Sequence, residues 1–165
     1  QAEVGIMSVE WFQVSQWVYL TLTADTTLQE LLAGDGRVPG HQQGIYMEMA
    51  PQVDPVSQRA PVVPLVVVSL VSSGVDERAL CGNRIMTYPV MTITGYHRQD
   101  GAIALSKLQA IMNRIDVLLD NQTDTNPNRV WFFRDGAEVV VTNTADARVE
   151  YGVASTYRCY ISVDV

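Results

Sequence analysis

IMTYPVMTITGYHRQDGAIALSKLQAIMNRIDVLL, residues Ile85 to Leu119, is the stretch that decides the fold. Its first half alternates with a period of two from Tyr88 to Tyr96, which is the pattern of an extended strand with two different faces. Met91 and Ile93 occupy one of these faces. The other face carries Tyr88, Val90, Thr92, Thr94 and Tyr96. We therefore predict a strand here, at the centre of the sheet.

The second half of the stretch has a helical period. After a turn over His97–Gly101, apolar residues return every three or four positions, as they do on the buried stripe of an amphipathic helix. The stripe consists of Leu105, Leu108, Met112, Ile115 and Leu119. We predict a helix that ends at Leu119 and lays this stripe over the sheet.

Two further helices are predicted before residue 36. Ser8 is placed to cap the first, over Val9–Leu22, and the second begins with the capping box Thr27-x-x-Glu30 and ends at Gly34. The first helix has an apolar stripe of Trp11, Val14, Val18 and Leu22. A strand over Val18–Leu22 is the alternative, because apolar residues also alternate there.

The middle of the chain is a long excursion followed by a strand. Prolines and glycines interrupt every period between residues 36 and 64, with room for one short strand at Ile45–Met49. Leu65–Ser72 is a continuous β-branched run, typical of a strand covered on both faces. Ser73–Asn83 is polar, and we predict an exposed link to the central strand.

The last third of the chain is predicted to be mostly strand. Turn residues fill Asn121–Asn128, and Val130–Arg134 and Glu138–Thr142 have the form of two strands joined in a hairpin at Asp135-Gly136. Val149–Val163 alternates over its whole length and is predicted to be a strand that bends at Gly152. The prediction is one α+β domain over residues 1–165, with a mixed, largely antiparallel sheet of five to six strands and two to three helices.

Composition disfavours several classes of function. The chain has 165 residues and a net charge of −7, with no lysine or arginine before Arg37, a balance that disfavours binding to phosphate backbones. The length of its most hydrophobic run, Val62–Val71, is about half the roughly twenty residues that a membrane helix needs. Cys81 and Cys159 match no metal or redox spacing, so we expect free thiols rather than a disulfide.

No motif indicates catalysis. His41 and His97 have no neighbouring ligands at metal spacing, and Asp120–Asn128 lacks the glycine and the closing glutamate of a calcium loop. There is no glycine-rich phosphate loop. The aromatic run Trp131–Phe133 suits core or interface packing better than base stacking in an acidic protein. We expect no enzymatic activity and no catalytic, cofactor-binding or metal-binding residues.

The order of elements resembles that of the tail terminator or tail completion (head-tail joining) proteins of long-tailed bacteriophages. The segments that carry the resemblance are WFQVSQWVYLTLTADTTLQELLAG, IYMEMAPQ, PLVVVSLVSS, YPVMTITGYHRQDG with ALSKLQAIMNRIDVLL, and EYGVASTYRCYISV. The Pro-punctuated segment Val38–Pro64 is longer than the family pattern.

The resemblance implies a structural virion protein, assembled in the host cytoplasm, that forms a ring, typically a hexamer, at the head-proximal end of the tail. Such a ring ends polymerisation of the tail tube and presents the surface for head attachment. Its partners would be copies of itself, the tail tube protein and a head-completion or neck protein. DNA would pass through the ring without sequence-specific binding, and no membrane or cofactor is involved.

Two segments are predicted to make contacts, because interfaces draw on Tyr, Met and Arg and both segments lie in long loops. They contain Tyr46, Met47 and Met49 in the excursion, and Asp76, Glu77, Arg78 and Arg84 in the segment Val75–Arg84. A covered edge strand is the alternative for the first group. The alternative functions are another phage neck or tail component, such as a tube subunit or a head-completion protein, or a small bacterial enzyme that uses His97 or Asp100.

Overall fold

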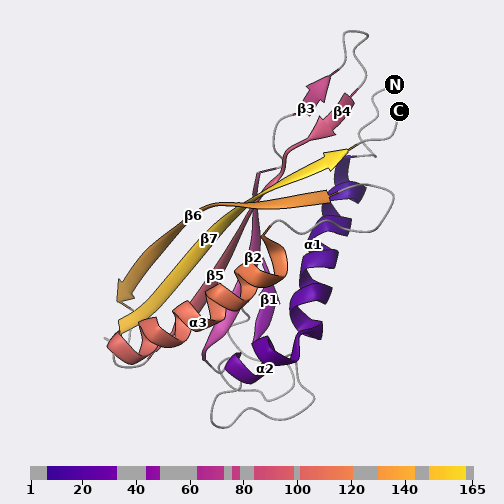
Figure 1. Cartoon of the computed structure of the whole chain (residues 1–165). Coiled ribbons are helices and arrows are strands. Elements are labelled where there is room, and N and C mark those ends of the chain that lie inside the picture. The colour runs from indigo at the N-terminus through magenta and orange to yellow at the C-terminus, as the bar shows by residue number, and fades with distance from the viewer. Residues whose placement is uncertain are drawn as a thin grey trace.

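The computed structural model describes residues 7–32, 44–48, 63–72, 76–78, 84–98, 101–120, 130–143 and 149–162 (Figure 1). Its helices are α1 (Met7–Ala24), α2 (Thr26–Leu32) and α3 (Gly101–Leu119). Its strands are β1 (Ile45–Met47), β2 (Leu65–Ser72), β3 (Asp76–Arg78), β4 (Arg84–Thr87), β5 (Val90–His97), β6 (Val130–Asn143) and β7 (Val149–Ser162). None of the described helices is long and apolar enough to cross a bilayer.

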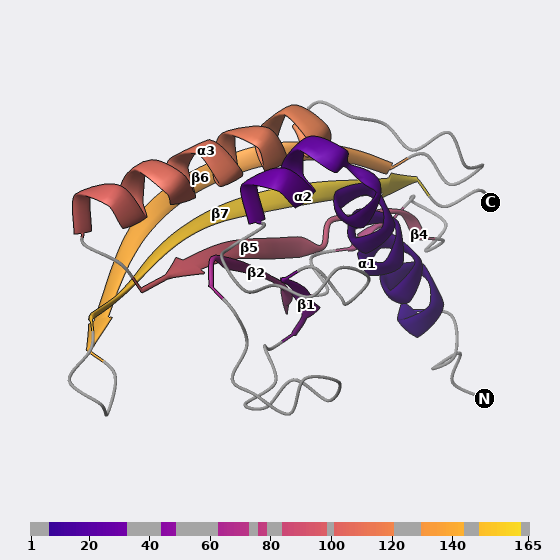
Figure 2. The ribbon, with the colours of Figure 1, turned by 90° about the horizontal axis from the view of Figure 1, so that it is seen from below.

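The fold class is α+β, as predicted. Seven strands form one sheet, and the helices cover one of its faces (Figure 2). Strands β1 and β2 are parallel, whereas every other pair in the described sheet is antiparallel. The prediction of a mixed, largely antiparallel sheet is therefore confirmed.

The seven strands occupy fewer positions across the sheet, because β4 and β5 lie end to end. Ile161 of β7 pairs with Val130 of β6 and with Thr87 of β4, so β6 and β4 lie on opposite edges of β7. Strand β5 follows β4 along that same edge, and between them the Cys159 N–H donates to the Pro89 carbonyl at 2.9 Å. The order across the sheet is thus β1, β2 with β3, β5 with β4, β7 and β6.

The central strand and the long helix form the core as predicted. Met91 and Ile93 are fully buried under the helices, whereas Val90 and its same-face neighbours are half-buried on the other side. Leu108, Met112, Ile115 and Leu119 of α3 are buried with Ala104 and Ile111. Leu105 is only half-buried, since the buried stripe follows Ala104 and Ile111 rather than Leu105.

The N-terminal helix is confirmed over the alternative strand, because Val14, Val18 and Leu22 are buried at the period of a helix. It begins at Met7, so Ser8 lies within the helix rather than at its cap. The cap of α2 is Asp25 rather than Thr27: the Leu28 N–H donates to Asp25 Oδ1 at 2.7 Å. Gly34 lies outside the described residues.

One prediction about the strands was wrong, and one strand was not predicted. The segment expected to be a hairpin at Asp135-Gly136 is one strand, β6, whose register against β7 shifts between Arg134 and Gly136. Asp135 is therefore the extra residue of a β-bulge, and the long partner β7 keeps both halves of β6 in the sheet. Strand β3 was not predicted: it lies within the polar link, lacks a hydrophobic period, and forms because β4 lies beside it.

Candidate interaction surface

The predicted contact residues of the polar link lie on a β-ribbon. Strands β2 and β3 form one arm of the ribbon, and β4 and β5 form the other. The β3–β4 end projects beyond the helices (Figure 1). The Cα partners in this end are Asp76 with Thr87, Glu77 with Met86, and Arg78 with Arg84. The structure thus brings Asp76, Glu77, Arg78 and Arg84 together on one projecting element.

The other predicted contact group lies on β1, at the edge of the sheet. Backbone hydrogen bonds from Val66 N to Gly44 O at 2.7 Å and from Glu48 N to Val68 O at 2.8 Å attach this strand to β2. Tyr46 is buried with Leu65 and Val67 on the sheet face opposite the helices, and Met47 is half-buried against the core. This is the arrangement of the covered edge strand. Met49 lies outside the described residues.

A polar cluster links the end of α3 to strands β6 and β7, and no local pattern in the sequence marks it. Asp116 accepts a hydrogen bond from the Tyr157 hydroxyl and pairs with Arg134 at 2.5 Å (Nη1–Oδ2). The Arg134 backbone N–H donates to Asp120 Oδ1 at 3.0 Å. Burial, followed by the Asp116 carboxylate, raises the pKa of Tyr157 well above its ordinary value, so this hydroxyl remains a donor. The cluster anchors the bulged part of β6 to α3.

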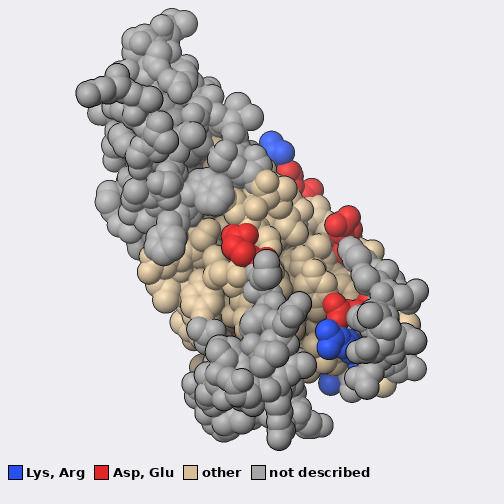
Figure 3. All heavy atoms as spheres, turned by 180° about the vertical axis from the view of Figure 1, so that it is seen from behind, with Lys and Arg blue, Asp and Glu red and all other residues tan. Residues whose placement is uncertain are grey.

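The sheet face opposite the helices carries paired charges. Glu150 and Arg158 alternate along β7 with core-facing residues, so their side chains lie on this other face. Arg98 Nε lies 2.5 Å from Glu150 Oε2, and Arg158 Nη2 lies 2.8 Å from Asp135 Oδ2. Much of the visible, described part of this face is uncharged (Figure 3).

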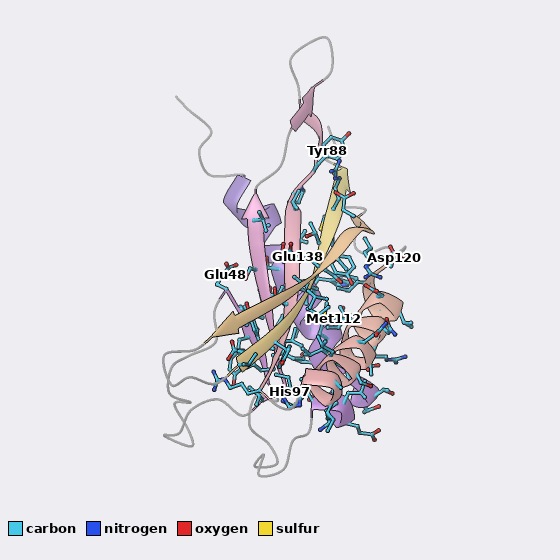
Figure 4. All side chains as sticks on the ribbon, turned by 90° about the vertical axis from the view of Figure 1, so that its left-hand side faces the viewer. Glu48, Tyr88, His97, Met112, Asp120 and Glu138 are labelled. Atoms are coloured by element: carbon cyan, nitrogen blue, oxygen red, sulfur yellow. The ribbon has the colours of Figure 1, made fainter. Side chains whose placement is uncertain are left out.

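Of the two residues named for the alternative enzyme, His97 and Asp100, the structure describes His97. His97 is buried at the end of β5, near the start of α3, whereas Met112 lies between α3 and the sheet (Figure 4). Cys159 is a buried free thiol whose pKa is raised by burial to about 12. Within the described segments, no group of His, Cys, Asp and Glu side chains is placed to hold a metal ion. His41, Cys81 and Asp100 lie outside the described residues.

Both lateral edges of the sheet are open within the described part of the chain. Strand β6 pairs with β7 alone, and every residue from Arg134 to Val139 is exposed. On the opposite side, β1 covers only Val66–Val68 of β2. Val71, beyond the covered part, is 64% exposed.

No protein-family model and no curated protein matches the chain. The fold is shared with a solved structure. A chain of the "Virion of native gene transfer agent (GTA) particle" is 16% identical, with a TM-score of 0.56, and the match covers 88% of this chain and 92% of that one. A second structure is 11% identical, with a TM-score of 0.45 and coverages of 93% of this chain and 97% of that one. At 16% identity, the first likeness shows a shared fold.

Proposed function

We propose that this chain is a structural protein of a phage-type virion that forms a ring, capping the head-proximal end of the tail tube and offering a surface for head attachment. The observation that carries the proposal is the shared fold with a gene transfer agent virion chain, which extends over nearly the whole length of both chains. The order of elements, which resembles that of tail terminators, supports the specific position in the tail.

The projecting β3–β4 ribbon suits a protein that acts by contact. Strand β4 also pairs with β7 at Met86 and Thr87, so within the described residues only the end of the ribbon at Arg78 and Arg84 is two-stranded. Two-stranded ribbons are marginally stable in water without further packing. Arg78 and Arg84 are Cα partners at this end of the ribbon. A partner surface packed against this end of the ribbon would stabilise it. Copies of the chain and neighbouring tail proteins are the candidates for that surface.

The charge of the chain suits a ring through which DNA passes. A net charge of −7 opposes adhesion of the phosphate backbone to the channel. In this role the protein is not an enzyme and requires no cofactor, because stopping polymerisation needs only a surface that fits the tube end and refuses another tube subunit.

The experiment is to image purified protein by negative stain, alone and mixed with tail tubes of the virus that encodes it, and to measure its mass by light scattering. We expect closed rings, either free or at one end of the tubes, and tubes that stop growing when the protein is added. If the protein is strictly monomeric and leaves tube length and tube ends unchanged, the proposal is refuted. Open-ended growth would identify a tube subunit instead, and binding to the portal alone a head-completion protein.

A matched pair of variants tests the ribbon. Arg78→Glu with Arg84→Glu reverses two charges at the projecting end, whereas Lys107→Glu reverses an exposed charge on α3. We expect the double variant to cap fewer tube ends than wild type and Lys107→Glu to cap as many. Equal capping by all three proteins would remove the ribbon from the contact surface and leave the ring proposal in place.

A further inference from the structure

Within the described residues, the outer edge of β6 has no partner strand. Strand β6 has 14 residues and, within the described part of the chain, pairs on one side only. Exposed edges of this length present unpaired N–H and C=O groups that can pair with another chain, and natural proteins usually shorten, charge or cover them. Beyond the bulge at Asp135, the segment from Gly136 to Asn143 contains a single charged residue, Glu138.

The same chain offers an open edge on the opposite side of the sheet. The parallel strand β1 pairs only with Val66–Val68, so the described remainder of β2, Ser69–Ser72, has no strand on its outer side. Strand β3, which continues the same arm, pairs only with β4 among the described strands. The sheet therefore has an open segment on each side.

The strand directions make these two edges complementary. Strand β2 is antiparallel to β5, β5 to β7, and β7 to β6, so β6 and β2 run in opposite directions. A rotation about an axis along the strands preserves those directions, and it places β6 of one copy antiparallel to β2 of the next. Antiparallel pairing is the kind that most of this sheet already uses.

We propose that neighbouring copies of this chain join their sheets edge to edge, with the Gly136–Asn143 segment of β6 pairing with the open β2–β3 edge of the next copy. The inference rests on the proposed ring and names the surface that builds it. The contact is head-to-tail, because two different edges meet, and a repeated head-to-tail contact closes into a ring when its rotation allows. Main-chain hydrogen bonds supply the affinity in strand addition of this kind.

Three valines of nearly equal exposure allow a matched test. Val139 on β6 is 61% exposed, Val71 on β2 is 64% exposed, and Val117 on α3 is 63% exposed. Each is changed to lysine, which native edge strands use to prevent pairing. Because all three side chains already face solvent, we expect each variant to fold, and circular dichroism melting checks this.

The assembly of each variant is measured by sedimentation velocity over a range of protein concentrations, and by negative stain on tail tubes. We expect Val117→Lys to assemble as wild type does. Val139→Lys and Val71→Lys should each raise the concentration for half-assembly at least ~10-fold, a change of ~1.4 kcal/mol per contact. If either edge variant builds rings as readily as Val117→Lys does, the edge-to-edge contact is wrong.

A mixture distinguishes head-to-tail from symmetric pairing. Val139→Lys protein retains an intact β2–β3 edge, and Val71→Lys protein retains an intact β6 edge. Mixing the two should therefore produce heterodimers that neither variant forms alone, without larger rings. A mixture that stays monomeric overturns the inference. If wild type and both edge variants form rings equally well, only this edge-to-edge contact is refuted. If the wild-type protein neither assembles nor binds tubes, the proposed function is refuted.

Discussion

Asp25 and Arg114, 89 positions apart in the chain, form a two-pronged ion pair that joins the α1–α2 corner to the middle of α3. Arg114 Nε lies 3.0 Å from Asp25 Oδ1, and Nη2 lies 2.6 Å from Oδ2. The same Oδ1 accepts the Leu28 N–H at 2.7 Å, so one carboxylate both caps α2 and holds it against α3.

The double role of Asp25 can be separated by substitution. Asp25→Ala removes the cap and the ion pair, and loss of the cap alone should lower the free energy of unfolding by ~1 kcal/mol. Asp25→Ser keeps a capping oxygen but loses the pair, so chemical denaturation should place its stability between those of wild type and Asp25→Ala. Equal stability of the serine and alanine variants would show that the cap contributes nothing.

The stability of the protein should fall in acid through Asp25. The hydrogen bond from Arg114, and then the one from Leu28, lower the pKa of Asp25 below its ordinary value of 3.8, with burial opposing them. A carboxyl with a depressed folded-state pKa contributes stability above its unfolded pKa and loses it as the pH falls through the folded value. The difference in unfolding free energy between wild type and Asp25→Asn should therefore be constant above about pH 5 and shrink below about pH 4. A difference that grows in acid would contradict this assignment.

Gly95 provides close contact between β5 and α3. A Cβ at this position would lie 3.1 Å from Leu108 Cδ2 and 3.5 Å from Met112 Sδ. Gly95→Val should therefore cost about 1–3 kcal/mol through overpacking. In a Leu108→Ala background the same change should cost less, because the space it needs has been vacated. A double-mutant cycle from urea denaturation measures the difference, and simple additivity would place the two residues out of contact.

Leu108→Asp should abolish folding, since it places a carboxylate at a position with no solvent exposure. Gln109→Asp, one residue further along α3 and exposed, introduces the same charge and should leave the protein soluble and folded. Soluble yield and circular dichroism compare the two. A folded Leu108→Asp protein would mean that α3 faces the sheet with a different side.

Cys159 should react with thiol reagents only when the protein opens. Burial raises its pKa to about 12, so the reactive thiolate is scarce at neutral pH, and the sulfur is shielded by the core. In a Cys81→Ser background, labelling should be slow in buffer and rapid in denaturant. Rapid stoichiometric labelling of the native protein would contradict the burial of β7 at this position.

Much of the fold could be predicted because its periods are local. Residues close together in the sequence set both the alternation around Met91 and Ile93 and the helical stripe through Leu108 and Ile115. The structure buries those four side chains. The last strand was predicted for the same reason. Local chemistry was ambiguous at Asp135-Gly136, where the same residues suit a hairpin or a bulge. Pairing along the whole of β7 selected the bulge.

The candidate interaction surface was only partly visible in the sequence. Residue type and loop length singled out Arg78 and Arg84, but their pairing across the projecting ribbon depends on the register of β3 against β4. Nothing local marked the open edge of β6, because an edge is defined by the strand that is missing beside it.

The sequence by itself determined which segments are helix or strand wherever a single hydrophobic period runs through them. The reason is that nearby residues together form the apolar face that must be buried. Only the tertiary structure decided which polar groups meet: Asp25 with Arg114, and Asp116 with Tyr157 and Arg134. The physical reason is that the partners of these ion pairs and hydrogen bonds are far apart in the sequence and are brought together only by the fold. No periodic pattern along the sequence indicates which of them will meet.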